Sequence, residues 1–379
     1  MTTPKPEAES TLRFRRLQRA GGAAVTRLSL LSSAVAAVAL AATATAVAAP
    51  VRLETPHLSE IARGPAVLSD TTASARSVQR LLGPGEFWGG PYTTPSGETV
   101  TVYVSRSYPE DPATGQRWAN FLDSLIHGSE LSSLTVFLAS PTDVESTCGL
   151  LAIACYSPNR DVLIAPGDDP SSDTSAEAVV THEYGHHVAA HRSNRPWDAI
   201  DYGTKRWASY EQVCSNARKG RFFPGAEDLP RYRLNPGEAF AETYRVLNER
   251  RAGLAEAPWE VVSQVFYPTD AALGLVEQDV RKPWSKDTTT TRVSSVTKAT
   301  RVRTFTVPTA LDGTFGLTLR PPAGARLALD VFSSSTRLAH AVSSKAVSLT
   351  RTICGQRSLR VRVSVLRGAG TFRLTLQTP

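Results

Sequence analysis

Residues 174–191 read Thr-Ser-Ala-Glu-Ala-Val-Val-Thr-His-Glu-Tyr-Gly-His-His-Val-Ala-Ala-His, and this stretch predicts the central helix of the first domain. It begins with the capping-box pattern Thr174-Ser-Ala-Glu177, in which a hydroxyl and a carboxylate satisfy free N–H groups at the start of a helix. Valines and histidines follow at helical spacing as far as His191. The sequence therefore predicts one capped helix here.

Two histidines on this helix are candidate metal ligands. His182 and His186 are four residues apart, so their side chains differ by about 40° around the helix axis and can bind one metal ion together. Glu183 lies beside them, where its carboxylate can act as general base toward metal-activated water. Two unrelated histidines can share a helix face by coincidence, but a capped helix that follows a predicted strand favours the metal site.

A catalytic zinc ion requires a third protein ligand and one open position. The long metzincin pattern would place a glycine three residues after the second motif histidine and a histidine three residues further on. Those positions hold Ala189 and Arg192, so that class is excluded. We expect the other histidines of the helix, His187 and His191, to lie on its surface.

A second stretch offers the third ligand. Residues 235–245 read Asn-Pro-Gly-Glu-Ala-Phe-Ala-Glu-Thr-Tyr-Arg. Pro236 suits the first turn of a helix, and Glu238 and Glu242 are four residues apart, so both carboxylates lie on one helix face. One can bind the metal while the other accepts a hydrogen bond from a ligand imidazole. The spacing alone leaves open which glutamate does which.

Together, the His-Glu-x-x-His helix and the Glu-x-x-x-Glu motif within a Phe-Ala-Glu phrase resemble a gluzincin metallopeptidase, close in style to the lethal-factor branch. The resemblance covers about residues 95–255. It implies that Glu238 binds zinc, that Glu242 supports a ligand histidine, and that Tyr232 stabilises the oxyanion. It also implies a zincin fold and hydrolysis of peptide bonds with Glu183 as the base. The thermolysin-like Asn-Glu-x-x-Ser-Asp phrase is absent, so no substrate preference follows.

Alternating and amphipathic segments surround the two motifs. Alternating β-branched and aromatic residues predict strands, and apolar residues at spacings of three and four predict helices. The predicted strands are 99–104, 134–138 and 161–165, and the predicted helices outside the first stretch are 115–127, 205–219 and 238–251. This order predicts an α+β zincin-like domain over 95–285, with a sheet beside a central active-site helix.

The pattern changes after Pro283. A threonine run indicates a linker over 286–299. Short alternating segments then recur between turn residues and predict an all-β sandwich or jelly-roll domain over 300–379. These segments are 302–307, 315–319, 327–331, 359–365 and 372–376. Residues 320–330 and 368–376 resemble phrases of the bacterial pre-peptidase C-terminal domain, a small β-sandwich attached to secreted peptidases.

The N-terminus predicts export. Five arginines precede an uncharged, alanine-rich stretch that ends in Ala46-Val-Ala-Ala-Pro50. This fits a signal peptide over 1–49, and a membrane anchor is the alternative. Residues 50–94 are then an N-terminal segment or a propeptide.

Cysteine usage agrees with an extracytoplasmic location. Four cysteines after a signal peptide indicate disulfides rather than a metal cluster. The short spacing of Cys148 and Cys155 favours a local pair, which leaves Cys214 with Cys354. Buried free thiols are the alternative.

Charge is distributed unevenly. The formal net charge of the chain is +7, yet residues 290–379 alone carry twelve arginines and two lysines against two aspartates. A basic C-terminal domain predicts an anionic partner, which is an envelope polymer, a membrane surface or the acidic remainder of the chain itself, and a solvated arginine-rich face is the alternative. Nucleic acid is not an expected partner, because export carries the chain away from it.

These patterns predict a secreted zinc-dependent endopeptidase. One alternative is a non-catalytic envelope-binding protein on a zincin scaffold, but such a module does not require His182, Glu183, His186 and Glu238 together. The other alternative is a zinc hydrolase that cleaves a non-peptide amide, which the sequence does not exclude.

Overall fold

The structure is a computed structural model that describes residues 86–228 and 230–379. The expected signal peptide over 1–49, and all but the end of the expected N-terminal segment, lie outside the described residues. Every element described below belongs to one compact unit of the chain. Among the described residues, no helix has the length and apolar character needed to cross a membrane.

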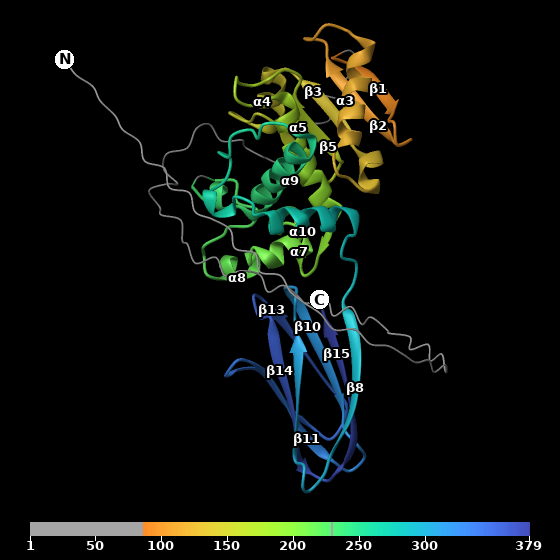
Figure 1. Ribbon diagram of the computed structural model, residues 1–379, viewed down its shortest axis with the longest axis vertical. Helices are drawn as coiled ribbons and strands as arrows, with labels where there is room; N and C mark the ends of the chain where they lie inside the picture. Colours follow the sequence, from red (N-terminus) through yellow and green to blue (C-terminus); the bar gives the residue numbers. More distant parts are fainter. Residues whose placement is uncertain (1–85, 229) are drawn as a thin grey trace, which may run out of the picture. The chain divides into compact units, whose positions relative to one another are not determined.

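A mixed five-stranded sheet underlies the first part of the described chain (Figure 1). In hydrogen-bonded order its strands are β1 (Phe87–Thr93), β2 (Thr99–Ser105), β3 (Thr135–Ala139), β5 (Val162–Pro166) and β4 (Cys155–Ser157). The central pairings, β2 with β3 and β3 with β5, are parallel, and the outer pairings are antiparallel. Nearly every residue of β3 and β5 is buried, as expected for parallel strands covered on both faces.

The sheet begins earlier than the sequence indicated. Residues 87–93, which we expected in the N-terminal segment over 50–94, form β1 and pair with β2 along its whole length. Gly89-Gly90-Pro91 indicated a turn, but β1 is an edge strand, where glycine and proline are tolerated. Gly89 also permits a close approach, because a Cβ there would lie 2.3 Å from the carbonyl oxygen of Val102.

Helices pack on this sheet and extend the domain beyond it. They are α3 (Pro112–Ser124), α4 (Pro141–Cys148), α5 (Ala176–Ala190), α6 (Ala199–Tyr202), α7 (Lys205–Tyr210), α8 (Val213–Arg218), α9 (Pro236–Ala252) and α10 (Asp270–Arg281). Between them lie the 3-10 turns η1 (Ser129–Ser133), η2 (Tyr232–Leu234) and η3 (Gln264–Phe266), and the short pair β6 (Ser193–Asn194) and β7 (Trp197–Asp198). The single helix predicted over 205–219 is wrong: Gln212, with a φ of 54°, interrupts it between α7 and α8.

The two faces of the sheet pack into different cores. Val136 and Leu163 contribute to the large core, which also contains apolar residues of α3, α5 and α9. Their neighbours Phe137 and Ile164 face the smaller core that contains Val144 of α4. This division follows from the alternation of side chains along a strand. The expected central helix, α5, contacts β4, β5 and α9.

The C-terminal region is all-β and consists of two antiparallel four-stranded sheets. One sheet has the order β13 (Val347–Ile353), β10 (Gly313–Arg320), β15 (Gly370–Thr378), β8 (Thr288–Val296). The other has the order β12 (Thr336–Ser343), β11 (Arg326–Ser333), β14 (Ser358–Arg367), β9 (Val302–Pro308). Inward-facing residues of both sheets form one shared core, which is the arrangement of a β-sandwich.

The expected linker over 286–299 holds a strand instead. β8 pairs with β15 along its whole length. Its threonines are β-branched, so an exposed edge strand accommodates them as readily as a loop does. The strands β12 and β13 were also not expected, because their apolar positions are interrupted by polar and charged residues on exposed edges.

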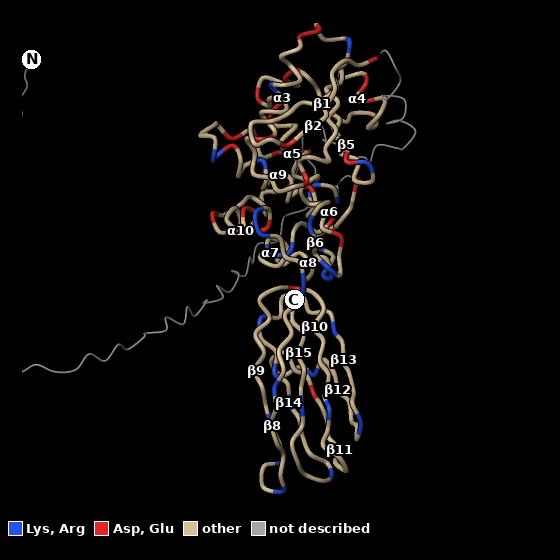
Figure 2. Tube along the Cα trace, turned by 90° about the vertical axis from the view of Figure 1, so that its right-hand side faces the viewer, with Lys and Arg blue, Asp and Glu red and all other residues tan. Residues whose placement is uncertain are grey.

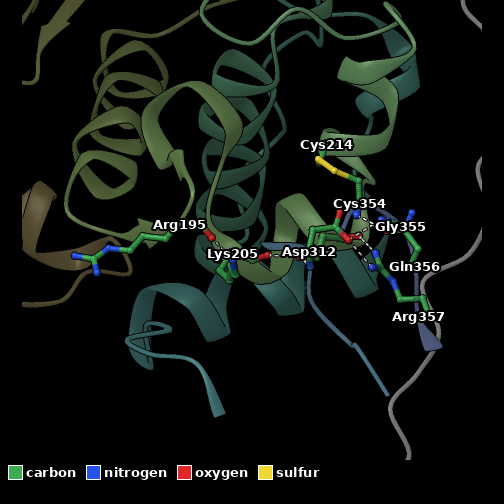
Figure 3. The surroundings of a disulfide bond; sticks show 9 residues. Arg195, Lys205, Cys214, Asp312, Cys354, Gly355, Gln356 and Arg357 are labelled. Atoms are coloured by element: carbon green, nitrogen blue, oxygen red, sulfur yellow. Dashed lines mark hydrogen bonds and ion pairs between the residues drawn. A yellow bond between two sulfur atoms is a disulfide. The ribbon is translucent and has the colours of Figure 1, made fainter. Parts of the chain in front are cut away.

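Both expected disulfides are present. Cys148–Cys155 connects the end of α4 to β4, with a Cα–Cα distance of 5.7 Å. Cys214–Cys354 connects α8 to the residue after β13, with a Cα–Cα distance of 5.4 Å (Figure 3). The predicted pairing is confirmed, and disulfides fit an oxidising, extracytoplasmic compartment.

A polar cluster lies beside the Cys214–Cys354 disulfide (Figure 3). The carboxylate of Asp312 accepts hydrogen bonds from the backbone of Gly355 (2.7 Å) and from the guanidinium of Arg357 (2.5 Å). Arg357 also donates to the backbone carbonyl of Ser209 on α7, and the Ser209 hydroxyl accepts from the Asp312 backbone (2.9 Å). The β-sandwich is therefore joined to the helical part by covalent and polar contacts.

Candidate metal centre

A close helix crossing brings the two sequence motifs together. α5 carries the histidine motif and packs against α9, which carries both glutamates. Gly185 lies at the contact: a Cβ there would be 2.8 Å from the Cα of Ala241. Real Cβ atoms do not approach that closely, so the glycine in the motif permits this crossing.

Both helices begin at side-chain caps that define their first turns. The hydroxyl of Ser175 accepts from the backbone N–H of Ala178, so the capping residue of α5 is the serine rather than the threonine of the predicted box. The Asn235 side chain caps α9 through Gly237, and Pro236 occupies the first turn as predicted. Glu238 is thereby held in the first turn of α9.

Three candidate ligand atoms converge between the helices. His182 Nε2 and His186 Nε2 are 3.2 Å apart, and each is 3.4 to 3.5 Å from Oε2 of Glu238. All three side chains are buried, with at most 3% of each residue exposed. A tetrahedral ion with bonds of about 2.0–2.2 Å has ligand atoms roughly 3.3–3.6 Å apart. The buried His/Glu group therefore has the separations and the donor atoms needed to hold a metal ion.

Glu242 orients one of the imidazoles. His182 Nδ1 donates to Glu242 Oε1 at 2.9 Å, so in the neutral ring that a metal ion requires, Nε2 carries no hydrogen and faces the other two ligand atoms. The guanidinium of Arg245 pairs with Glu242 at 2.5 Å and with Glu249 at 2.7 Å. The sequence did not reveal Arg245 and Glu249 as part of this network. Arg245 is three residues after Glu242 and Glu249 is four residues after Arg245, so all three lie on one helix face.

The electrostatics of the centre favour positive charge. Burial raises the pKa of Glu242, but Arg245 and His182 outweigh burial and lower that pKa to about 2. The pKa of Glu238 is also well below its usual value, since the charge and hydrogen bonds of His186 and His182 exceed the effect of burial. Burial lowers the pKa of His182, but hydrogen bonds with Glu238 and Glu242 raise it well above the usual value. Two ionised carboxylates thus attract a cation to the two imidazoles.

The two predicted catalytic side chains also lie at this centre. The Tyr232 hydroxyl, on η2, donates to Oε2 of Glu238 at 2.8 Å, the same oxygen that faces both imidazoles. Glu183 is 1% exposed, and its charge is among those that raise the pKa of His182. The structure therefore brings together all six residues that the sequence selected. They are His182, Glu183, His186, Tyr232, Glu238 and Glu242.

One expectation about the remaining histidines is wrong. His187 is fully buried rather than on the helix surface. It packs between α5 and the sheet, where its ring contacts Tyr156 of β4. His191 is partly exposed, as expected, with 32% of its side chain accessible.

Comparisons with known proteins give only distant likenesses. No protein-family model and no curated protein matches the chain. Among solved structures it is similar to the pre-peptidase C-terminal domain of a collagenase from Bacillus anthracis, with 15% identity, 23% of this chain and 87% of that chain covered, and a TM-score of 0.20. It is also similar to a mitogen from Yersinia pseudotuberculosis, with 8% identity, 24% and 87% covered, and a TM-score of 0.21.

A third likeness is to a family GH115 4-O-methyl-alpha-glucuronidase, with 11% identity, 54% of this chain and 39% of that chain covered, and a TM-score of 0.18. The first of the three is a domain of the class that the C-terminal phrases resemble. These TM-scores are too low for any of the likenesses to support an argument about function.

Proposed function

We propose that the chain is a secreted zinc endopeptidase whose metal is held by His182, His186 and Glu238. The observation that carries this proposal is the convergence of two imidazole nitrogens and one carboxylate oxygen within 3.2–3.5 Å of one another. Two imidazoles and a carboxylate are a ligand set of catalytic zinc sites, which keep one position open. The two disulfides support an extracytoplasmic location.

The side chains around the centre divide the chemistry among them. A bound zinc ion would polarise the scissile carbonyl and lower the pKa of water toward neutrality. The carboxylate of Glu183 takes the proton of the attacking water, because it adjoins His182 on the same helix without belonging to the ligand group. The Tyr232 hydroxyl donates a hydrogen bond to the oxyanion that forms on the carbonyl oxygen. Its present acceptor, Oε2 of Glu238, places that hydroxyl at the ligand group.

Glu242 acts through His182 rather than on the substrate. It accepts from Nδ1 and so holds the ring in the tautomer that presents Nε2 to the metal. Arg245 keeps Glu242 ionised and fixes its position from the opposite side. The arrangement supports the order of roles in which Glu238 is the ligand and Glu242 is the positioning residue.

The Glu183→Gln variant tests the role of the general base separately from metal binding. The variant is expected to bind zinc as the parent does and to lose hydrolysis of an unstructured protein substrate such as casein, because the ligands remain and the base is removed. Glu177→Gln, an exposed position in the first turn of the same helix, is the matched control and should retain activity. Wild-type turnover by Glu183→Gln would contradict the mechanism.

Two other outcomes would identify the alternative functions. Zinc bound without cleavage of any peptide, but with hydrolysis of cell-wall amides, would indicate the non-peptide hydrolase. Zinc absent from the parent protein and no hydrolysis of either substrate would indicate a binding module on the same scaffold.

We also propose that the C-terminal β-sandwich binds an anionic envelope polymer. Lysine and arginine predominate over acidic residues along its strands (Figure 2). Part of this charge is compensated, because Asp330 pairs with Arg362 at 3.1 Å and with His340 at 2.8 Å. Binding of the full chain to purified anionic cell-wall polymer should weaken as salt is raised. Salt-independent binding, or none, would assign the arginines to a solvated face.

A further inference from the structure

A second cluster of metal-binding side chains lies on the neighbouring face of α5. One ligand atom from each of Asp161, His187 and His191 lies within 4.8 Å of the others. Oδ1 of Asp161 is 2.9 Å from Nε2 of His191 and 3.6 Å from Nδ1 of His187. His187 directly follows His186, so this histidine pair is turned about 100° around the helix axis from the first pair. The two histidine pairs therefore lie on different sides of the same helix.

The hydrogen bonds of His187 leave its ring nitrogen Nδ1 as an acceptor. Nε2 lies 2.9 Å from the backbone carbonyl oxygen of Glu130, which can only accept, so Nε2 carries the hydrogen. With the hydrogen on Nε2, Nδ1 presents a lone pair to the cluster. A backbone carbonyl that fixes the tautomer in this way is the usual support of a metal-binding histidine.

The Tyr156 hydroxyl connects two members of the cluster. The Tyr156 hydroxyl lies 2.9 Å from Nδ1 of His187 and 2.9 Å from Oδ1 of Asp161. A tyrosine has one hydroxyl hydrogen, so it can be donated to only one of these two acceptors, and the ring N–H of His191, 2.9 Å from the same Asp161 oxygen, can serve the carboxylate. A cation held by Asp161, His187 and His191 would take the place of these hydrogens.

The surroundings suit a bound cation. No lysine or arginine of the described chain forms an ion pair with Asp161, in contrast to Asp330, which pairs with Arg362 and Arg337. His191 caps the C-terminus of α5, where the helix dipole is negative. About a quarter of the Asp161 side chain and a third of the His191 side chain are exposed, so an ion and its water ligands can enter.

The backbone directs Asp161 into the cluster. Its φ is 54°, a left-handed conformation that aspartate and asparagine adopt more readily than most residues, in the turn that precedes β5. This turn places the carboxylate beside the end of α5, although Asp161 and His187 are distant in sequence.

We propose that Asp161, His187 and His191 form a second zinc site, which anchors the last turn of α5 to the turn before β5. Two imidazoles and a carboxylate favour zinc over magnesium or calcium, which prefer oxygen ligands. The site differs from the first centre in all three ligands. It does not depend on the proposed peptidase activity, and it contributes to the rigidity of the helix that carries both histidine pairs.

Zinc stoichiometry of the full chain tests the site. After dialysis against a zinc-buffered solution, elemental analysis is expected to find two zinc ions in the parent and one each in His191→Ala and Asp161→Asn. His182→Ala, which disrupts the first centre, should retain one, and His182→Ala with His191→Ala should retain none. Asp161→Asn suits the left-handed backbone, so it tests ligation with little risk to folding. Added zinc should raise the Tm of His182→Ala but not that of the double variant.

A matched control is His340→Ala. His340 also pairs with an aspartate at 2.8 Å, but arginines take the place of a third ligand there, so zinc content should not change. If His191→Ala and Asp161→Asn bind as much zinc as the parent, the second site does not exist. If these two variants lose zinc and His182→Ala does not, the second site holds and the first centre fails. The two proposals are thus tested separately.

Discussion

Replacement of Gly185 by alanine tests whether the helix crossing assembles the metal centre. The added Cβ would lie 2.8 Å from Cα and 3.2 Å from the carbonyl oxygen of Ala241, whereas ordinary contacts begin at 3.4 Å. α5 and α9 must therefore separate by about 0.6 Å to accommodate the methyl group. Because backbone atoms are involved, no flexible side chain can move aside to relieve the overlap.

The effect on stability is the difference between two opposing terms. Overpacking in a closely packed contact costs about 1–3 kcal/mol. Alanine favours a helix interior over glycine by about 1 kcal/mol. The expected net loss in the free energy of unfolding is therefore roughly 0–2 kcal/mol, so the protein should still fold.

The effect on zinc is larger, because the ligand set spans the crossing. Glu238 on α9 lies 3.4 Å from His182 and 3.5 Å from His186 on α5. Widening these separations by about 0.6 Å moves them beyond the roughly 3.3–3.6 Å of a tetrahedral zinc site. We expect zinc affinity to fall about 10- to 100-fold, as when the support of a ligand is removed.

The assay is a competition titration with a chelating zinc indicator, combined with urea unfolding of the metal-free protein. Gly274→Ala on α10 is the matched control, because no atom lies within 4 Å of a Cβ built there. It should stabilise the protein by about 1 kcal/mol and leave zinc affinity unchanged. If Gly185→Ala behaves like Gly274→Ala in both measurements, the crossing does not determine the geometry of the centre.

Three further predictions concern other contacts. In zinc titrations, Glu238→Ala should abolish binding at this centre, whereas Glu242→Ala should weaken it about 10- to 100-fold; the reverse order would exchange their roles. In urea unfolding, the Cys214→Ser/Cys354→Ser variant should lose about 5 kcal/mol of unfolding free energy, because its disulfide closes a loop of 140 residues. The Cys148→Ser/Cys155→Ser variant should lose about 2.4 kcal/mol, because its loop has only seven residues. Equal losses would reject this chain-entropy explanation. Burial raises the pKa of Glu130, but Arg192 holds it below the usual 4.5, so the pair stabilises the fold above pH 4.5 and loses this contribution as the pH falls through the lowered pKa. Glu130→Gln should therefore lower stability by about 3–5 kcal/mol at pH 7, and this difference should shrink as the pH falls below 4.5 through the lowered pKa; a pH-independent difference would contradict that origin.

Local patterns predicted most of the regular structure and the candidate ligands. Helical spacing located α5 and α9, and alternation located β2, β3, β5 and five strands of the sandwich, because side-chain periodicity is a property of each segment alone. The same spacing put His182 with His186, and Glu238 with Glu242, on common faces. The pairing of Cys148 with Cys155 followed from their proximity in sequence.

Long-range contacts explain the errors. Gly89 to Pro91 indicated a turn, and the threonines of β8 indicated a linker. Both predictions were wrong, because a strand at a sheet edge forms through pairing with its partner strand rather than through its own residue pattern. The break at Gln212 was missed because a left-handed residue other than glycine leaves little signal in the sequence.

The candidate ligands of the first centre could be identified from the sequence, because residue types and helical spacing are local properties. How these side chains meet, and that Asp161 joins His187 and His191, depends on the packing of the folded chain. The contact between Gly185 and Ala241 sets the distance between the ligand helices, and the bond from His182 to Glu242 distinguishes the two glutamates. Whether His187 is buried depends on the strand packed over it. Such contacts join residues far apart in the chain, and their geometry exists only once the helices and strands have packed.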